Sequence, residues 1–222
     1  MTTTQPTTAP PRERAAPRGT RAVAVLAVAL LAALLLRSFV VQTFSIPSAS
    51  MAPTLEAGER VLVWRVGAQE VRRGDVVVFD GTGTFAPAPP EPATGLARAG
   101  AAVGSALGFH PGESDFVKRV VGLPGERITC CDADGRLLVD GEPLDEPYLP
   151  PGEAPSAVRF DVEVPPGRLW VMGDHRGDSV DSRSFLGSPG GGTVAVEDVV
   201  GRVVAISWPP TELGTVEREA DE

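Results

Sequence analysis

One stretch of this chain is too apolar, over too great a length, to lie in an ordinary loop or surface. Residues 22–36 carry no polar group, Arg37 and Ser38 interrupt the run, and residues 39–41 resume it. As a helix, residues 22–41 would be about 30 Å long, which matches the hydrocarbon core of a bilayer. A secretory signal is the alternative, but its cleavage site would lie far beyond the apolar run. We therefore predict one transmembrane helix over residues 22–44.

The segments on either side of this run set its expected orientation. Residues 1–21 are rich in Thr, Pro and Arg and have almost nothing to bury, which predicts a disordered tail. Their excess of arginine places the tail in the cytoplasm and residues 45–222 outside a plasma membrane that the chain crosses once. The whole chain has a net charge of −9, and the part after residue 21 is more acidic still. Nucleic acid is therefore an unsuitable partner, because phosphate contacts need a basic face.

Turn-forming residues dominate the remainder of the chain. The 25 glycines and 22 prolines favour short strands joined by frequent turns. Residues 134–141 have the tight-turn signals of a hairpin. Residues 81–113 read as an insertion, and residues 211–222 as an acidic tail. The fold class is therefore mainly β, with strands predicted at residues 60–64, 76–79, 116–121, 158–164, 168–172 and 199–208.

Two serines follow the apolar run within a rigid frame. Ser48 and Ser50 lie between Pro47 and Pro53, and proline keeps such a segment extended. Residues two apart in an extended chain point to the same side, so both hydroxyls could face one site. The stretch suits a nucleophilic serine assisted by a second hydroxyl. It equally suits a polar turn after a membrane anchor.

The chain contains a single lysine, Lys118, against 19 arginines. An amine can lose its proton when it is buried, whereas a guanidinium does not. Strand alternation places Phe116, Lys118 and Val120 on one face and Arg119 on the other. Burial among apolar groups lowers the pKa of a lysine, so Lys118 is a candidate general base. The alternatives are a composition bias that spared one lysine, or an amine that reaches water from a half-exposed strand.

The remaining polar features are less specific. Cys130 and Cys131 are adjacent, and the histidines are far away in sequence, so a structural metal site is not expected. Two buried thiols at a strand end are favoured over a strained vicinal disulfide. The charged stretch 173–183 follows a predicted strand directly. It is either a solvated loop with weak ion pairs or a polar shell that orients a catalytic group.

Four stretches together resemble one family. Residues 46–55, 73–79, 116–126 and 173–183, in that order after an anchor, are similar to the motifs of bacterial type I signal peptidases, which are membrane-bound serine proteases with a serine–lysine dyad. The matching residues include Ser50-Met51, Lys118-Arg119, Gly173-Asp174, Ser179 and Asp181-Ser182-Arg183. His175 and Asp178 stand where the family commonly has asparagine. The resemblance implies an antiparallel β-sheet catalytic domain over residues 45–222, with 81–113 as a variable insertion.

The resemblance also implies a role for each residue. Ser50 would be the nucleophile and Lys118 the neutral base. Ser48 Oγ and the Ser50 N–H would form the oxyanion hole. Ser179 would orient Lys118, and Asp181 and Arg183 would pair as scaffold. Shallow pockets for small side chains would be lined by Ile46, Pro47, Met51, Leu55, Phe116 and Val117.

The implied activity is the removal of signal peptides from secretory preproteins after a small-x-small motif. The implied protein is a monomer that needs no cofactor and contacts phospholipid. Two alternatives remain at this point: a single-pass scaffold with an inactive peptidase domain, and a serine hydrolase that uses His175 with Asp174.

Overall fold

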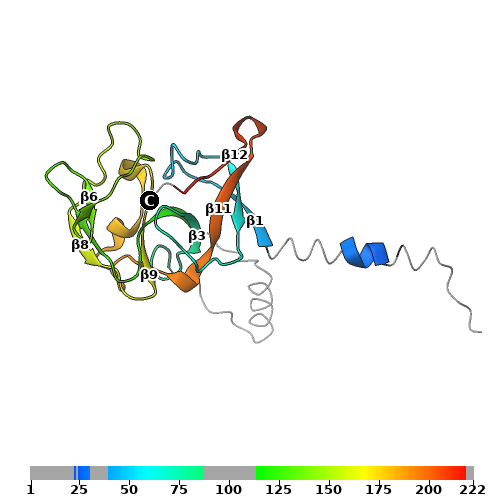
Figure 1. Cartoon of the computed structure of the whole chain (residues 1–222), viewed down its shortest axis with the longest axis horizontal. Helices are drawn as coiled ribbons and strands as arrows, with labels where there is room; N and C mark the ends of the chain where they lie inside the picture. Colours follow the sequence, from blue (N-terminus) through cyan, green and yellow to red (C-terminus); the bar gives the residue numbers. More distant parts are fainter. Residues whose placement is uncertain (1–22, 24, 31–39, 88–113, 219–222) are drawn as a thin grey trace, which may run out of the picture. The chain divides into compact units, whose positions relative to one another are not determined.

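The computed structural model describes residues 23, 25–30, 40–87 and 114–218 (Figure 1). The chain divides into two units, Met1–Ser38 and Phe39–Glu222. In the first unit, residues 25–30 are helical and exposed. Within the described ranges, no helix is both long enough and apolar enough to cross a membrane. Residues 22, 24 and 31–39 of the expected transmembrane helix, the whole tail 1–21 and most of the insertion lie outside these ranges.

The second unit is built on a large antiparallel sheet (Figure 1). In the described residues its order is β1-β2-β11-β3-β4-β9-β10, with β12 paired to β11. A smaller sheet has the order β7-β6-β5-β8. The strands of the large sheet are β1 (Val41–Ser45), β2 (Arg60–Trp64), β3 (Val76–Asp80), β4 (Asp115–Gly122), β9 (Arg168–Met172), β10 (Val194–Ala195), β11 (Val199–Trp208) and β12 (Gly214–Thr215). The small sheet contains β5 (Arg127–Cys130), β6 (Leu137–Val139), β7 (Glu142–Pro143) and β8 (Phe160–Glu163).

The predicted strands are all present, with small changes at their ends. β2, β9 and β11 have the predicted bounds. β3 is one residue longer at its end than predicted, and β4 is one residue longer at each end. The continuous apolar run Val76–Phe79 is buried on both faces, as a central strand requires. The elements between strands are short 3₁₀ turns: η1 (Arg176–Asp178), η2 (Ser182–Phe185), η3 (Val196–Asp198) and η4 (Pro210–Glu212).

Apolar side chains cover both faces of the large sheet. One cluster, which includes Met51, Leu55 and Val78, lies beneath the proline-framed serine stretch. A second, which includes Phe79 and Val120, covers the opposite face. A third joins the two sheets around Trp170, which is fully buried. Each fully buried side chain of this size stabilises the fold by roughly 1.5–3 kcal/mol, so the serine stretch rests on a rigid base.

Both ends of this unit differ from the prediction. Residues 41–44, predicted as the end of the membrane helix, are extended and pair with β2, Val41 facing Trp64. In an extended chain, Val41, Thr43 and Ser45 share one face and Phe44 lies on the other. This pattern suits a half-exposed strand better than a helix in lipid. The tail after residue 211 is also partly folded, since β12 pairs with β11 and Arg218 Nε donates to Asp75 at 2.7 Å.

The two cysteines form a disulfide, so the prediction of two buried thiols is wrong. β5 ends at Cys130, and the peptide bond between Cys130 and Cys131 is cis. The two Cα atoms are therefore only 3.1 Å apart, and the side chains meet on the same side of the chain. Cys130 packs in the cluster that joins the sheets.

Candidate active site

Ser50 and Lys118 meet at the centre of the candidate site. Ser50 lies in the loop between β1 and β2, and Lys118 lies in the middle of β4. The Lys118 Nζ is 2.7 Å from Ser50 Oγ and donates a second hydrogen bond to the Val117 carbonyl at 3.0 Å. Ser48 Oγ donates to Ser50 Oγ at 3.3 Å, so the two hydroxyls face one site as predicted. The segment itself is not extended, because the Ala52 N–H donates to the Ala49 carbonyl at 3.0 Å and closes a turn. Ser50 and Lys118 are 7% and 4% exposed.

The surroundings of Lys118 favour its neutral form. Burial lowers the pKa of Lys118 from 10.5 to about 8, although the carboxylates of Asp181 and Asp174 act in the opposite direction. The interpretation of Lys118 as an amine that reaches water is therefore wrong. A buried amine beside a hydroxyl can accept the proton of that hydroxyl, which is the first requirement for a serine–lysine nucleophile.

A buried ion pair on the other face of β4 holds the serine loop. The guanidinium of Arg119 donates to both carboxylate oxygens of Asp174, at 2.8 and 2.6 Å, and to the Gly74 carbonyl at 2.9 Å. Asp174 also accepts a hydrogen bond from Thr54 Oγ1 at 2.6 Å. Arg119 and Asp174 are 1% and 0% exposed, and the Arg119 guanidinium lies 4.0 Å from the centre of the Tyr148 ring. Thr54 is thereby tied to the strand that carries Lys118.

The loop after β9 completes the support of Ser50. The backbone N–H of His175 donates to the Ser50 carbonyl at 3.2 Å. Gly173 lies against the same carbonyl, and a Cβ at this position would overlap Ser50 O and Ser179 Oγ. Glycine is therefore required for the close approach of the two segments. Because Asp174 and Asp181 are fully buried, the interpretation of residues 173–183 as a solvated loop is wrong.

Asp181 and Arg183 form the predicted ion pair. Arg183 donates through Nε and Nη2 to the two oxygens of Asp181, at 2.9 and 2.7 Å. Burial alone would raise the pKa of Asp181, but hydrogen bonds from Arg183 and from the Gly173 N–H hold it below its ordinary value. The carboxylate therefore stays charged and fixes the start of the loop at Gly173.

Ser179 lies in this loop but does not contact Lys118 directly. Its Oγ is buried beside Gly173, and the hydrogen-bond partners of Lys118 Nζ in the described residues are Ser50 and Val117. The expected hydrogen bond between Ser179 and Lys118 is not formed in this structure. The Ser179 side chain acts instead on Asp181, whose pKa it helps to lower.

A cavity of about 230 Å³ opens beside Ser50. Five of the six residues predicted to line the substrate pockets do so: Ile46, Pro47, Met51, Phe116 and Val117. Leu55 does not, because it is fully buried in the cluster beneath the loop. Phe44, Ser45 and Asp115 line the same cavity and were not predicted. Phe44 and Ser45 belong to β1. The sequence assigned residues 41–44 of this strand to the membrane helix.

Comparison with known proteins identifies the family. The family model described as "Signal peptidase, peptidase S26" matches residues 19–208. The chain belongs to the signal peptidase family. It is 36% identical over 209 residues to "Probable signal peptidase I" of Mycobacterium leprae (strain TN), covering 77% of this chain and 70% of that protein. It is 38% identical over 204 residues to "Signal peptidase I" of Mycobacterium tuberculosis (strain ATCC 25618 / H37Rv), covering 77% and 66%.

The family membership confirms that the chain is a serine peptidase, a hydrolase. The chain spans about two thirds of the length of these relatives. Among solved structures, it resembles a signal peptidase I from Enterococcus faecalis V583 with a TM-score of 0.38 and 23% identity, covering 60% of this chain and 95% of that one.

The described contacts do not support a base at His175. This residue reaches Ser50 through its backbone amide, while Lys118 occupies the position next to the Ser50 hydroxyl. The side chain of Asp174 is engaged by Arg119 and Thr54. In the part of the chain that the structure describes, no group of three or more His, Cys, Asp or Glu side chains could hold a metal ion.

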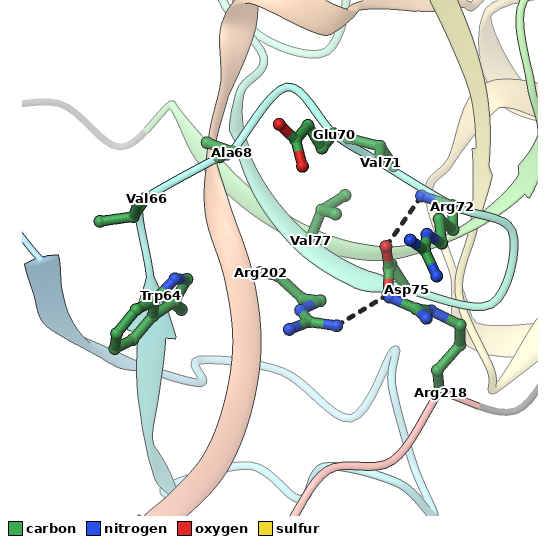
Figure 2. Close-up of a pocket in the computed structure, with 11 residues that line it drawn as sticks. Trp64, Val66, Ala68, Glu70, Val71, Arg72, Asp75, Val77, Arg202 and Arg218 are labelled. Carbon is green, nitrogen blue, oxygen red and sulfur yellow. Dashed lines mark hydrogen bonds and ion pairs between the residues drawn. The ribbon is translucent and has the colours of Figure 1, made fainter.

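A second cavity, of about 330 Å³, contains neither Ser50 nor Lys118 among its lining residues (Figure 2). The carboxylate of Asp75 lies in it and is only 2% exposed. It accepts hydrogen bonds from the Arg72 N–H at 2.8 Å and from Arg218 at 2.7 Å, and Arg202 lies 3.6 Å away. Figure 2 shows these groups converging on Asp75 from separate segments. The network ties the C-terminal segment to β3.

Proposed function

We propose that this protein is a membrane-bound serine endopeptidase that removes N-terminal signal peptides from exported preproteins. Ser50 is the nucleophile and Lys118 the general base. The observation that carries the proposal is the 2.7 Å separation between Lys118 Nζ and Ser50 Oγ, with an amine whose pKa burial lowers to about 8. The family membership and the names of the relatives support the same reaction.

Each step of acyl transfer has a residue suited to it. The neutral Lys118 amine accepts the Ser50 proton as Oγ attacks the scissile carbonyl. The Ser48 hydroxyl and the Ser50 N–H stabilise the oxyanion, each donor typically contributing about 100- to 1000-fold to the rate. The Lys118 ammonium then gives its proton to the departing amine. In the second half of the reaction, Lys118 accepts a proton from the water that hydrolyses the acyl-enzyme.

The cavity beside Ser50 supports the preference for small side chains before the cleavage site. Its apolar lining excludes large groups by steric overlap rather than by specific contacts. β9 pairs with β4 only from Arg119 onward. In the described chain, residues 115–118 therefore offer that edge of β4 to an extended substrate.

We further propose that the protein acts as a monomer in the plasma membrane. The apolar run 22–36 supports one membrane crossing, and the arginine-rich tail supports a cytoplasmic N-terminus. The catalytic domain then lies outside, where exported preproteins emerge. Its apolar surface near residues 44–55 contacts the phospholipid.

The proposal is tested by cleavage of a secretory preprotein in detergent or liposomes, with the new N-terminus mapped. Wild type is expected to cut after a small-x-small site, and both Ser50→Ala and Lys118→Ala are expected to be inactive. Ser184→Ala, which changes an exposed serine in η2, serves as the matched control and keeps full activity. Failure of wild type to cut would favour the inactive scaffold, and normal cutting by Lys118→Ala would reject the mechanism.

A further inference from the structure

One wall of the catalytic cavity is held from behind by an aromatic cluster. Phe116 lines the cavity, and its ring packs on Phe79 at 5.9 Å and on Phe85 at 5.3 Å between ring centres. Phe85 also contacts Phe79 at 5.2 Å and Phe185 at 4.8 Å. Phe79 is fully buried in a central strand, so it is a fixed support. Phe85 comes from the start of the insertion, to which the family resemblance assigns no role.

Gly81 brings the first turn of the insertion against the same ring. A Cβ at Gly81 would lie 2.5 and 2.6 Å from two ring carbons of Phe116 and 2.8 Å from the Cβ of Phe85. These separations are too short for carbon atoms, so the Phe116 ring occupies space that only glycine leaves open. The Gly81 backbone is not in the left-handed region, so it does not itself exclude an alanine.

The turn that carries Phe85 is tightly closed. The N–H groups of Thr84, Phe85 and Ala86 all donate to the Gly81 carbonyl, at 3.1, 2.7 and 2.9 Å. At its start, the Gly81 N–H donates to the Ser114 carbonyl at 2.8 Å, just before β4 begins. The position of the Phe85 ring is therefore fixed relative to Phe116 by backbone hydrogen bonds.

We propose that this turn, residues 81–86, sets the depth of the catalytic cavity and thereby the size of substrate side chain that the enzyme accepts. Gly81 and Phe85 act as positioning residues through Phe116, and neither lines the cavity. The inference rests on the proposed function, since it concerns the substrate of the same site. It assigns a role to the beginning of the insertion.

The two positions make opposite predictions. Removing the Phe85 ring frees space behind Phe116, so the Phe116 ring can withdraw and the cavity becomes larger. Adding a methyl group at Gly81 forces the Phe116 ring to shift, and because Phe79 and Phe85 close the space behind it, the ring moves into the cavity. A change of one methylene group in an apolar pocket alters selectivity by about 10- to 200-fold.

The experiment measures kcat/KM of the full chain in detergent for one preprotein. The residue one or three positions before the cleavage site is varied among Gly, Ala and Val. Phe85→Ala is expected to raise the Val-to-Ala ratio at one of these positions by about tenfold. Gly81→Ala is expected to lower the Ala-to-Gly ratio at the same position. In the double variant, the two ratios should return towards their wild-type values. The added methyl group can then occupy the space that the Phe85 ring leaves empty.

Phe185→Ala is the matched control, since it removes a ring that contacts Phe85 and lies outside the ring contacts of Phe116. It should leave the selectivity ratios unchanged, and an equal change in this variant would overturn the proposal. Phe85→Leu, a smaller disturbance of folding, is expected to move the ratios in the same direction as Phe85→Ala. Cleavage by wild type with unchanged ratios in the Phe85 and Gly81 variants rejects this inference alone. Absence of cleavage by wild type rejects the proposed function.

Discussion

The protonation state of Lys118 should control the rate of cleavage between pH 6 and 9.5. With a pKa of about 8, about one tenth of the enzyme carries the neutral amine at pH 7. With the ordinary value of 10.5, the neutral fraction would be about one in three thousand. Burial of the lysine therefore accounts for about a 300-fold gain in active enzyme at neutral pH.

The assay is kcat/KM for preprotein cleavage as a function of pH. We expect the rate to rise about tenfold per pH unit at low pH and to level off above about pH 8. Ser48→Ala should lower the rate at every pH without moving the midpoint, because the Ser48 hydroxyl does not titrate in this range. Asp181→Asn removes a charge that raises the pKa of Lys118, so its midpoint should move to lower pH.

Two results would refute this reasoning. One is a rate that stays flat or falls between pH 6.5 and 8. The other is a rising limb that persists in Lys118→Arg, since a guanidinium remains protonated throughout this range.

Three further predictions concern the support of the site. Lys118→Met should raise the free energy of unfolding by about 3 kcal/mol at pH 7. In the wild type, folding must either bury a charged amine or remove its proton, and the variant avoids this cost. This gain is complete below pH 8 and should vanish as the pH rises to 10.5, as urea unfolding would show. Asp174→Asn leaves the buried Arg119 without a charged partner and should cost roughly 3 kcal/mol by the same measurement. Gly173→Ala places a methyl group against the Ser50 carbonyl and should lower kcat/KM about 100-fold while the circular dichroism spectrum is kept.

Gly187→Ala provides the control for the last of these, because a Cβ at Gly187 meets no atom within 4 Å. Equal activity of the Gly173 and Gly187 variants would show that the close approach at Ser50 does not matter. A Lys118→Met variant less stable than wild type at pH 7 would show that the lost hydrogen bonds outweigh the cost of burying the amine.

Local sequence patterns predicted the strands of the sheet and the apolar surroundings of Lys118 well. The strand at Val76–Asp80 was predictable because a short, continuous apolar run has few places other than a buried strand. Lys118 was conspicuous as a single amine among arginines, and alternation placed it correctly among apolar neighbours. The proline frame predicted that Ser48 and Ser50 share one side.

Long-range partners were not predictable in the same way. Arg119 follows Lys118 and was assigned only to the opposite face, yet its carboxylate partner Asp174 is 55 residues away. A buried ion pair has no signature in local periodicity, and only the sheet order, with β9 beside β4, brings the two together. The family resemblance assigned Leu55 to the substrate cavity, but the turn after Met51 directs it into the core.

Competing interpretations of the same residues explain the other differences. Residues 41–44 follow the apolar run without a break, so they were included in the predicted helix. Their pairing with β2 was therefore not expected. Adjacent cysteines bond only in an unusual backbone geometry, and the cis peptide between Cys130 and Cys131 has no sequence signal.

Lys118 and Arg119 hold the serine loop from opposite faces of one central strand. Lys118 contacts Ser50, and Arg119 donates to Thr54 Oγ1 directly and holds it through Asp174 as well. β4 lies between β3 and β9, so it separates from its neighbours only when the large sheet unfolds. The serine loop and Lys118 should therefore move apart in the same cooperative event. Heat should therefore end cleavage and melt the sheet at one temperature, without an intervening range in which the enzyme is folded but inactive.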